Sequence, residues 1–152
     1  MRVSAKTDYA LRAAVELAAA WGEGPVKGER LATSQSIPLR FLENILLQLR
    51  HAGIIESRRG ADGGYKLARP AAEITLADVI RAIDGPLAGV SGARPETLDF
   101  KGASEPLREV WVAVRASLRA VLEQVSLADV AANELPDNVH TLVAEPDAWV
   151  SH

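Results

Sequence analysis

A row of polar side chains recurs every four residues in the first half of the chain. Arg40, Asn44 and Gln48 follow this spacing, and Glu43 lies beside them. Residues four apart share one face of a helix, and guanidinium, amide and carboxylate groups are the donors and acceptors that recognise base edges in the DNA major groove. A solvated polar face would show the same spacing, so the row alone leaves both interpretations open.

A glycine-rich turn that begins with arginine is the second feature of chemical interest. Residues 59–64 read Arg-Gly-Ala-Asp-Gly-Gly, and the short flanking segments 54–58 and 65–68 are partly β-branched or aromatic. This pattern predicts a β-hairpin. Arg58 and Arg59 on such a hairpin would reach phosphates or a narrow minor groove, although glycine-rich turns with arginine also occur on many other protein surfaces.

The sequence contains no recognisable catalytic set. It has no cysteine, which excludes disulfides, thiolate metal sites and a cysteine nucleophile. The histidines His51, His140 and His152 fall at a helix end and in the tail, while Ser57 and Ser91 lack a nucleophile-elbow context. The glycine-rich turn also lacks the Lys-Ser/Thr ending of a phosphate-binding loop. We therefore expect a protein that is not an enzyme and has no metal site.

Charge is unevenly divided along the 152 residues. The net charge is -3, but residues 1–70 carry 11 Lys or Arg against 7 Asp or Glu, whereas residues 71–152 carry 6 against 13. A basic first half beside an acidic second half is typical of a protein with one nucleic-acid face and one solvated or partner-binding face. No apolar run approaches the ~20 residues that span a bilayer, and the N-terminus lacks a secretory signal. We expect a cytoplasmic protein without a membrane partner.

Three helices are predicted before the hairpin. The first begins after Ser4, a capping residue, and ends at Gly22; the second covers 26–34; the third opens at Pro38 and is ended by Gly53. The apolar stripe of the third helix, predicted to face the core, contains Phe41, Leu42, Ile45, Leu46 and Leu49. Helices and hairpin in this order predict a winged helix-turn-helix with the polar row facing DNA.

A fourth helix and a long irregular segment are predicted after the hairpin. Thr75 and Asp78 form a capping-box pattern at the start of this helix, and Gly85-Pro86 ends it. Its predicted buried stripe is Leu76, Val79, Ile80 and Ile83. The segment 85–104 has little periodicity, and loops of this length tend to be functional or disordered. We consider it an effector region or, equally, a plain linker.

Apolar residues from Ser104 to Val125 alternate spacings of four and three, the pattern of a coiled-coil seam. The seam residues are Leu107, Trp111, Val114, Leu118, Val121 and Val125. We expect this helix to form a homodimer contact; packing onto its own winged domain is the alternative. Ser126 and Asp129 repeat the capping pattern before a last short helix, and the acidic tail from Glu134 is expected to be loosely ordered.

Several of these motifs resemble the Rrf2 family of bacterial winged-helix regulators. The similarity covers about residues 2–132, and the segments that carry it are 6–12, 37–43, 59–68, 75–80 and 126–129, of which the hairpin sequence 59–68 is the most specific. The resemblance implies a dimer whose long fifth helices cross, with two winged domains on a partly palindromic operator. By family position, Glu43 and Asn44 would contact bases and Arg59 would enter the minor groove.

The chain departs from part of this family in its cysteine content. In several relatives the loop matching 85–104 carries three cysteines that hold an iron–sulfur cluster, and an acidic residue matching Asp8 can complete the coordination. Here every cysteine is missing. The resemblance therefore implies the DNA-binding architecture but no cofactor, as in the branch of the family that regulates cysteine metabolism without a cluster.

Together these patterns predict a mostly α-helical fold with a small β-hairpin wing. It comprises a winged helix-turn-helix domain (1–84), an effector-type loop (85–104), a dimerisation helix with a short terminal helix (105–133) and a tail (134–152). We expect a transcriptional repressor that binds double-stranded operator DNA as a homodimer, with a small molecule or a protein as its effector. The predicted DNA-binding residues are Ser36, Pro38, Arg40, Phe41, Glu43, Asn44, Gln48, Arg58, Arg59, Gly60 and Tyr65.

The main alternative is a protein- or ligand-binding module that keeps the winged fold while DNA binding is secondary. The basic residues of the third helix and the hairpin argue against it, because they suit phosphate contacts. Trp21 and Trp111 could line a ligand pocket between helices, although tryptophans at helical spacing more often belong to the core.

We predict that the purified protein carries no iron–sulfur cluster, even when prepared without oxygen. Such clusters are held mainly by cysteine thiolates, whereas Asp8, Glu96, Asp99 and Glu105 offer only hard oxygen ligands. Anaerobic purification followed by visible absorption and iron analysis tests this. Stoichiometric iron and sulfide with a charge-transfer band would contradict it.

Overall fold

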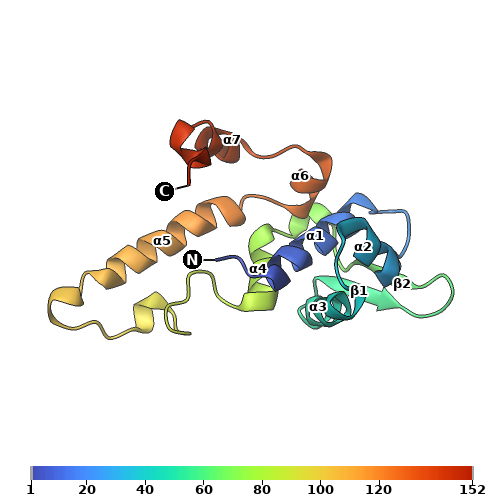
Figure 1. Cartoon of the computed structure of the whole chain (residues 1–152), viewed down its shortest axis with the longest axis horizontal. Helices are drawn as coiled ribbons and strands as arrows, with labels where there is room; N and C mark the ends of the chain where they lie inside the picture. The colour runs from blue at the N-terminus through green and yellow to red at the C-terminus, as the bar shows by residue number, and fades with distance from the viewer. Residues whose placement is uncertain (1, 152) are drawn as a thin grey trace.

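The computed structural model describes residues 2–151 and has the predicted mostly helical fold with one β-hairpin. A body built from the first four helices and the hairpin lies on one side, and a long helix extends from it (Figure 1). The helices and strands are α1 (Ala5–Ala19), α2 (Gly28–Gln35), α3 (Leu39–His51), β1 (Ile55–Arg58), β2 (Gly64–Leu67), α4 (Leu76–Asp84), α5 (Leu107–Leu122), α6 (Leu127–Ala132) and α7 (Asp137–Val143).

Helix α1 is the centre of the body, with α3, α4 and α6 packed against it. The residues it buries completely are small, namely Ala10, Ala13 and Ala14, and small side chains let neighbouring helices approach closely. At its start the buried Thr7 donates a hydrogen bond from Oγ1 to Asp84 Oδ2, at 2.5 Å. This contact joins the beginning of α1 to the end of α4.

The apolar stripe of α3 is buried except at its edge. Leu42, Ile45, Leu46 and Leu49 are fully buried, as predicted. Phe41, also assigned to this stripe, is 41% exposed. It directly precedes Leu42 and lies about 100° around the helix from it, so it reaches only the margin of the core, where its ring meets that of Tyr9 edge-on with centroids 5.7 Å apart.

Val26, which was predicted to begin the second helix, pairs with the hairpin instead. Val26 exchanges two backbone hydrogen bonds of 2.8 Å with Tyr65, forming an antiparallel bridge beside β2. Helix α2 therefore starts at Gly28. The strand partner of Val26 lies almost forty residues away in the sequence. Valine is β-branched and therefore favours an extended strand over the first turn of a helix.

The predicted buried stripe of α4 is only partly buried. Val79 and the neighbouring Ala77 are fully buried, whereas Leu76, Ile80 and Ile83 are half-buried. The capping box at the start of α4 is confirmed, since Thr75 Oγ1 accepts from the Asp78 N–H at 3.2 Å. The helix lies between α1 and α5, and α5 contacts it only lightly, so the side facing α5 keeps some exposure.

The chain returns to the body after α5, because the starts of α4 and α6 lie side by side. The Leu76 N–H donates to the Val125 carbonyl at 2.9 Å, and the Leu127 N–H donates to the Ile74 carbonyl at 2.8 Å. Leu127 is fully buried, so α6 belongs to the core of the winged body. Val125, predicted as a seam residue, lies beyond the end of α5 and is buried in the chain's own core.

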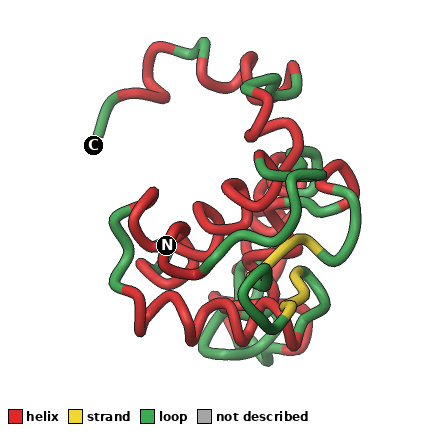
Figure 2. The backbone as a smooth tube through the Cα atoms, turned by 90° about the vertical axis from the view of Figure 1, so that its right-hand side faces the viewer, coloured by secondary structure: helices red, strands yellow, loops and turns green. Residues whose placement is uncertain are grey.

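The tail from residue 134, expected to be loosely ordered, contains α7 and a short 3-10 helix over Pro146–Trp149. Pro136 at the N-cap of α7 presets the backbone for a helix start. The Asn138 amide donates to the Ala120 carbonyl of α5 at 2.9 Å, which ties the tail to that helix. Figure 2 shows this C-terminal stretch arching away from the body. Within residues 2–151 no helix is long and apolar enough to cross a membrane.

Candidate nucleic-acid interface

The polar row lies on the outer face of α3. Arg40, Glu43 and Asn44 are exposed, and Gln48 is half-buried. Gln48 Nε2 donates to Asn44 Oδ1 at 2.7 Å, so the two amides orient each other along the helix. This contact leaves the Asn44 amide NH₂ as a donor and the Glu43 carboxylate as an acceptor next to each other.

The turn before α3 is built by a left-handed residue. Ser36 ends α2 with φ +54°, and the Ile37 N–H then donates to the Ala32 carbonyl at 2.9 Å. Ile37 is buried and anchors this turn. Pro38 was predicted to be the first helical residue but is the N-cap of α3, so the helix starts one residue later, at Leu39. Ser36 and Pro38 are both exposed beside the first turn of α3.

The tip of the hairpin is held by two glycines that tolerate no side chain. A Cβ on Gly63 would lie 2.1 Å from the Arg58 carbonyl oxygen, and one on Gly64 would lie 2.5 Å from the Val26 oxygen. This tight backbone exposes Arg58, Arg59 and Gly60 at the tip. Lys27 Nζ donates to the Gly60 carbonyl at 3.1 Å, which connects the tip to the start of α2.

Tyr65 differs from the other predicted DNA-binding residues because it is half-buried and packs against the core. A Cβ placed on Gly28 would be only 3.5 Å from its ring, so the ring occupies the junction between hairpin and α2. The sequence placed Tyr65 beside the arginine-bearing turn and gave no sign that its ring is half-buried. Its side chain therefore contributes to positioning the hairpin.

Further basic side chains surround the predicted residues. The segment from α2 to the hairpin, residues 27–66, carries seven Lys or Arg against four Asp or Glu, a net charge of +3. Lys27, Arg30 and Arg50 were not predicted, yet all three are exposed. Arg50 Nη1 also donates to Ser57 Oγ at 3.1 Å, joining α3 to β1. Their only sequence signal was the charge of the first half of the chain.

The two tryptophans considered for a ligand pocket lie apart. Trp21 is 51% exposed and lines a cleft of about 460 Å³ between the end of α1 and the hairpin, together with Tyr65. Trp111 lies on α5 and is half-buried. Trp21 is therefore not a core residue and shares no pocket with Trp111: α1 ends at Ala19, and Trp21 lies in the turn that follows it, where Gly22 and Gly24 have positive φ.

Residues 3–133 match the family model of Rrf2, described as an iron-dependent transcriptional regulator. The chain belongs to the Rrf2 family. An HTH-type transcriptional regulator of Mycobacterium tuberculosis is 50% identical over 142 residues, covering 93% of this chain and 88% of that protein. The regulator CymR of Bacillus subtilis is 35% identical over 131 residues, 86% of this chain and 90% of CymR.

Solved structures of this family have the same fold. The structure of B. subtilis CymR, described as the global cysteine regulator, aligns with a TM-score of 0.75 at 34% identity, covering 88% of this chain and 98% of that chain. T. potens IscR aligns with a TM-score of 0.68 at 32% identity, covering 100% and 93%. As an Rrf2 regulator, the protein is a winged-helix transcriptional regulator and not an enzyme, which confirms both predictions.

The iron dependence in the family description does not fit the residues of this Rrf2 member. It has no cysteine. Asp8, at the matching family position, is already paired with Arg12 at 2.7 Å, and Glu96 of the loop is paired with Arg115 at 2.5 Å. In the part of the chain that the structure describes, no three His, Cys, Asp or Glu side chains converge as metal ligands. These donors do not suit an iron–sulfur cluster.

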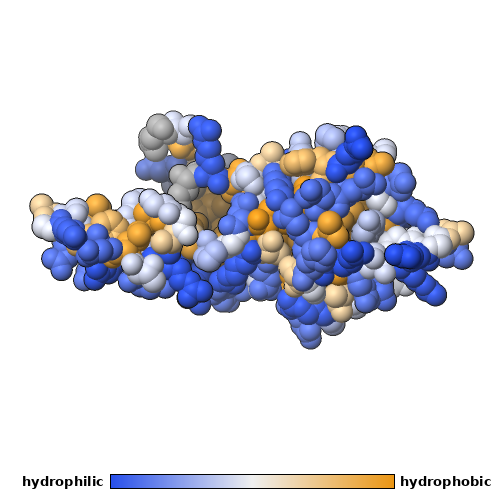
Figure 3. Space-filling model, turned by 90° about the horizontal axis from the view of Figure 1, so that it is seen from below, coloured by the Kyte–Doolittle hydropathy of each residue, from blue (hydrophilic) through white to orange (hydrophobic). Residues whose placement is uncertain are grey.

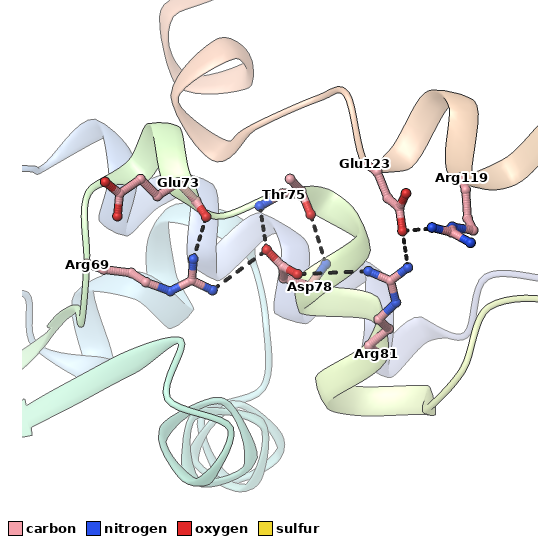
Figure 4. A network of polar contacts seen from close by, with 7 residues as sticks. All are labelled: Arg69, Glu73, Thr75, Asp78, Arg81, Arg119 and Glu123. Atoms are coloured by element: carbon pink, nitrogen blue, oxygen red, sulfur yellow. Dashed lines mark hydrogen bonds and ion pairs between the residues drawn. The ribbon is translucent and has the colours of Figure 1, made fainter.

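A chain of charged side chains links the hairpin side of the regulator to α5 (Figure 4). Asp78 at the start of α4 contacts Arg69, which follows β2, at 3.7 Å, and Arg81 at 3.9 Å. Arg81 pairs in turn with Glu123, which also accepts from Arg119 Nε at 3.0 Å. Three segments are thus joined through partly exposed ion pairs.

Glu123 has a lowered pKa because it accepts hydrogen bonds from two guanidinium groups. Those from Arg81, first, and Arg119, second, favour the carboxylate and hold its pKa below the ordinary value of 4.5. A carboxyl whose pKa is lower in the folded state stabilises the fold above its unfolded pKa, and that contribution disappears as the pH falls through the folded pKa.

We predict that Glu123→Gln lowers the denaturant midpoint at neutral pH, because the amide no longer pairs with Arg81 and Arg119. The difference from the wild type should shrink as the pH falls below about 4.5, the ordinary value. Denaturant unfolding at a series of pH values measures it. Glu23→Gln, in an exposed loop, is the control and should show no such pH-dependent difference. An equal loss at all pH values would mean that packing, not charge, explains the effect.

Proposed function

We propose that this regulator is a homodimeric repressor that recognises operator DNA by inserting α3 into the major groove. The observation that carries the proposal is the polar row on the outer face of α3, in which Arg40 and Asn44 are exposed and Gln48 is half-buried, beside the basic hairpin that contacts α3. An α-helix fits the major groove, and a symmetric dimer would present two such helices to half-sites about 34–36 Å apart or a multiple of that distance.

Within this interface the residues divide by role. Glu43 and Asn44 contact base edges, since a carboxylate accepts from cytosine and an amide pairs with adenine. Arg40, Arg58 and Arg59 contact phosphates or a narrow minor groove. Phe41, Ser36, Pro38 and Gly60 shape the surface around these side chains, and Phe41 offers an apolar contact for a thymine methyl group.

We predict different losses for Asn44→Ala and Arg59→Ala. Asn44→Ala should reduce discrimination at one or two base positions by about 1–3 kcal/mol, the scale of a good base-edge contact. Arg59→Ala should lower affinity more evenly, or lower the preference for A·T steps with a narrow minor groove. Fluorescence anisotropy on operator variants selected by sequencing of bound DNA measures both.

The matched control for this experiment is Lys101→Ala, which removes an exposed positive charge outside the interface. It should leave operator affinity unchanged. Equal losses on specific and random DNA for the two interface variants would contradict the division of roles. Loss of binding by the control as well would indicate general charge attraction instead of a defined interface.

The homodimer is supported by an apolar face that the single chain leaves uncovered. Leu107 is 42% exposed and Val110 50%. Beside them, α5 forms one wall of a groove of about 1290 Å³ whose lining is mainly apolar and includes Ile80, Val114, Leu118, Val121 and Leu142. Figure 3 shows this hollow with hydrophobic surface inside it. A continuous apolar groove along a helix suits the same helix of a second copy, because a two-fold interface is self-complementary.

We predict that Val114→Asp weakens this dimer, because it places a charge in the apolar groove. Sedimentation at micromolar concentration should show a dimer for the wild type and a shift towards monomer for the variant. Ala116→Asp, on an exposed position of α5 outside the groove, should remain dimeric. A stable wild-type monomer at that concentration would remove the proposed homodimer.

A further inference from the structure

Another hollow lies where the 85–104 loop meets α4 and α5. Figure 1 shows this loop and α5 on the opposite side of α4 from the hairpin. The volume of the hollow is about 500 Å³, within the range of small-molecule sites. The charged side chains that line it are Arg81, Arg94, Arg115, Arg119 and Glu96. We call this hollow the arginine pocket.

The lining of the arginine pocket carries more positive than negative charge. Four guanidinium groups line it against the single carboxylate of Glu96; Glu123 adds a second negative charge outside the lining. Guanidinium groups gathered around one hollow repel one another, and a bound anion would offset that repulsion. They also present planar forks of N–H donors that fit carboxylate, phosphate and sulfate groups.

The four arginines of the pocket differ in the ion pairs that they form within the chain. Arg115 pairs with Glu96 at 2.5 Å, and Arg81 and Arg119 share Glu123. Arg94 forms no ion pair with any carboxylate of residues 2–151. Arg94 is thus uncommitted, and Arg119 pairs only with Glu123, which it shares with Arg81, so donor capacity is left over for a ligand. Arg81 also contacts Asp78 at 3.9 Å.

The loop that forms one wall of the arginine pocket is held in place. Leu87 is 7% exposed, and Arg108 of α5 donates to the Leu98 carbonyl at 3.1 Å. Ala88 and Ser91 both have a φ of +51°, a left-handed backbone that is unfavourable for residues other than glycine. The buried Leu87 and the hydrogen bond between Arg108 and Leu98 hold the loop, so this wall has a defined shape.

We propose that the arginine pocket binds a small metabolite with two or more oxyanion groups and that this ligand is the effector of the regulator. The effector role rests on the proposed function; the binding itself does not. DNA phosphate is a weaker candidate, because the 85–104 loop and α5, which line the pocket, lie on the other side of α4 from α3 and the hairpin (Figure 1).

The route from the pocket to the DNA face runs through residues already described. A ligand oxyanion would compete with Glu123 for Arg81 and Arg119. Arg81 also contacts Asp78, which contacts Arg69 next to the hairpin (Figure 4). Ligand binding would therefore change the connection between α4 and α5, and it regulates DNA binding if the two arrangements differ in ligand affinity.

A second copy on α5 would leave the arginine pocket open. The apolar groove assigned to the dimer includes none of the four arginines. Arg115 and Arg119 directly follow the groove residues Val114 and Leu118, so they project about 100° further around the helix. The two sites share α5 but use different faces of it.

Isothermal titration with citrate and pyrophosphate, at an ionic strength held constant with chloride, tests the binding. We expect saturable heat for at least one probe, an affinity about tenfold lower in Arg94→Gln because one charged donor is lost, and no change in Lys101→Gln, which removes a charge from the same loop outside the pocket. Circular dichroism checks that both variants fold. Absence of saturable heat for both probes, or an equal loss in both variants, would overturn the site.

The effector role is tested by operator binding with and without saturating probe. The affinity for DNA should change by about fivefold or more, and this change should be absent in Arg94→Gln but present in Lys101→Gln. Binding of the probe without any change in operator affinity would overturn the effector role. Failure to bind any DNA both with and without probe would overturn the proposed function instead, and the titration would still decide the anion site.

Discussion

Two main-chain hydrogen bonds between the starts of α4 and α6 determine how the long helix is held. They join Leu76 to Val125 and Leu127 to Ile74, at 2.9 and 2.8 Å, and each helix start has its own capping box. The chain leaves the winged body at Gly85 and must return to it at Ser126. The C-terminal end of α5 is therefore fixed to the body, whereas its N-terminal end lies away from the body at the end of the 85–106 segment (Figure 1). A displacement of α5 acts on the starts of α4 and α6, two helices that pack against α1.

The polar contacts between α4 and α5 are suited to rearrangement. The ion pairs of Arg81, Arg119 and Glu123 are partly exposed, and such pairs typically contribute less than about 1 kcal/mol each. The buried contacts beneath them, such as Leu127 against α1, are far more costly to disturb. A ligand of modest affinity can thus exchange surface partners while the core of the body stays intact.

Local signals in the sequence predicted most of the fold, and long-range pairing accounts for most of the differences. Ser4, Thr75 and Ser126 cap helices as expected, because capping depends on residues three positions apart. Val26 and Val125 were misassigned because each is fixed by a distant partner, Tyr65 and Leu76 respectively. The exposed row of α3 followed from its period, whereas the arginine pocket gathers residues 81–119 without any periodic pattern and needs the three-dimensional structure to be seen.

The hairpin is attached to the body in a way that lets its exposed side chains change during evolution while its position is kept. Val26 and Tyr65 hold the hairpin through backbone groups, and every residue except proline can supply these. Substitutions at Arg58, Arg59 or Lys66 would therefore change the groups that the hairpin offers to a partner without changing the position of the hairpin on the body. Only Gly63 and Gly64 are constrained by space. Evolution can thus vary the recognition chemistry of the wing one side chain at a time, while its geometry is inherited unchanged.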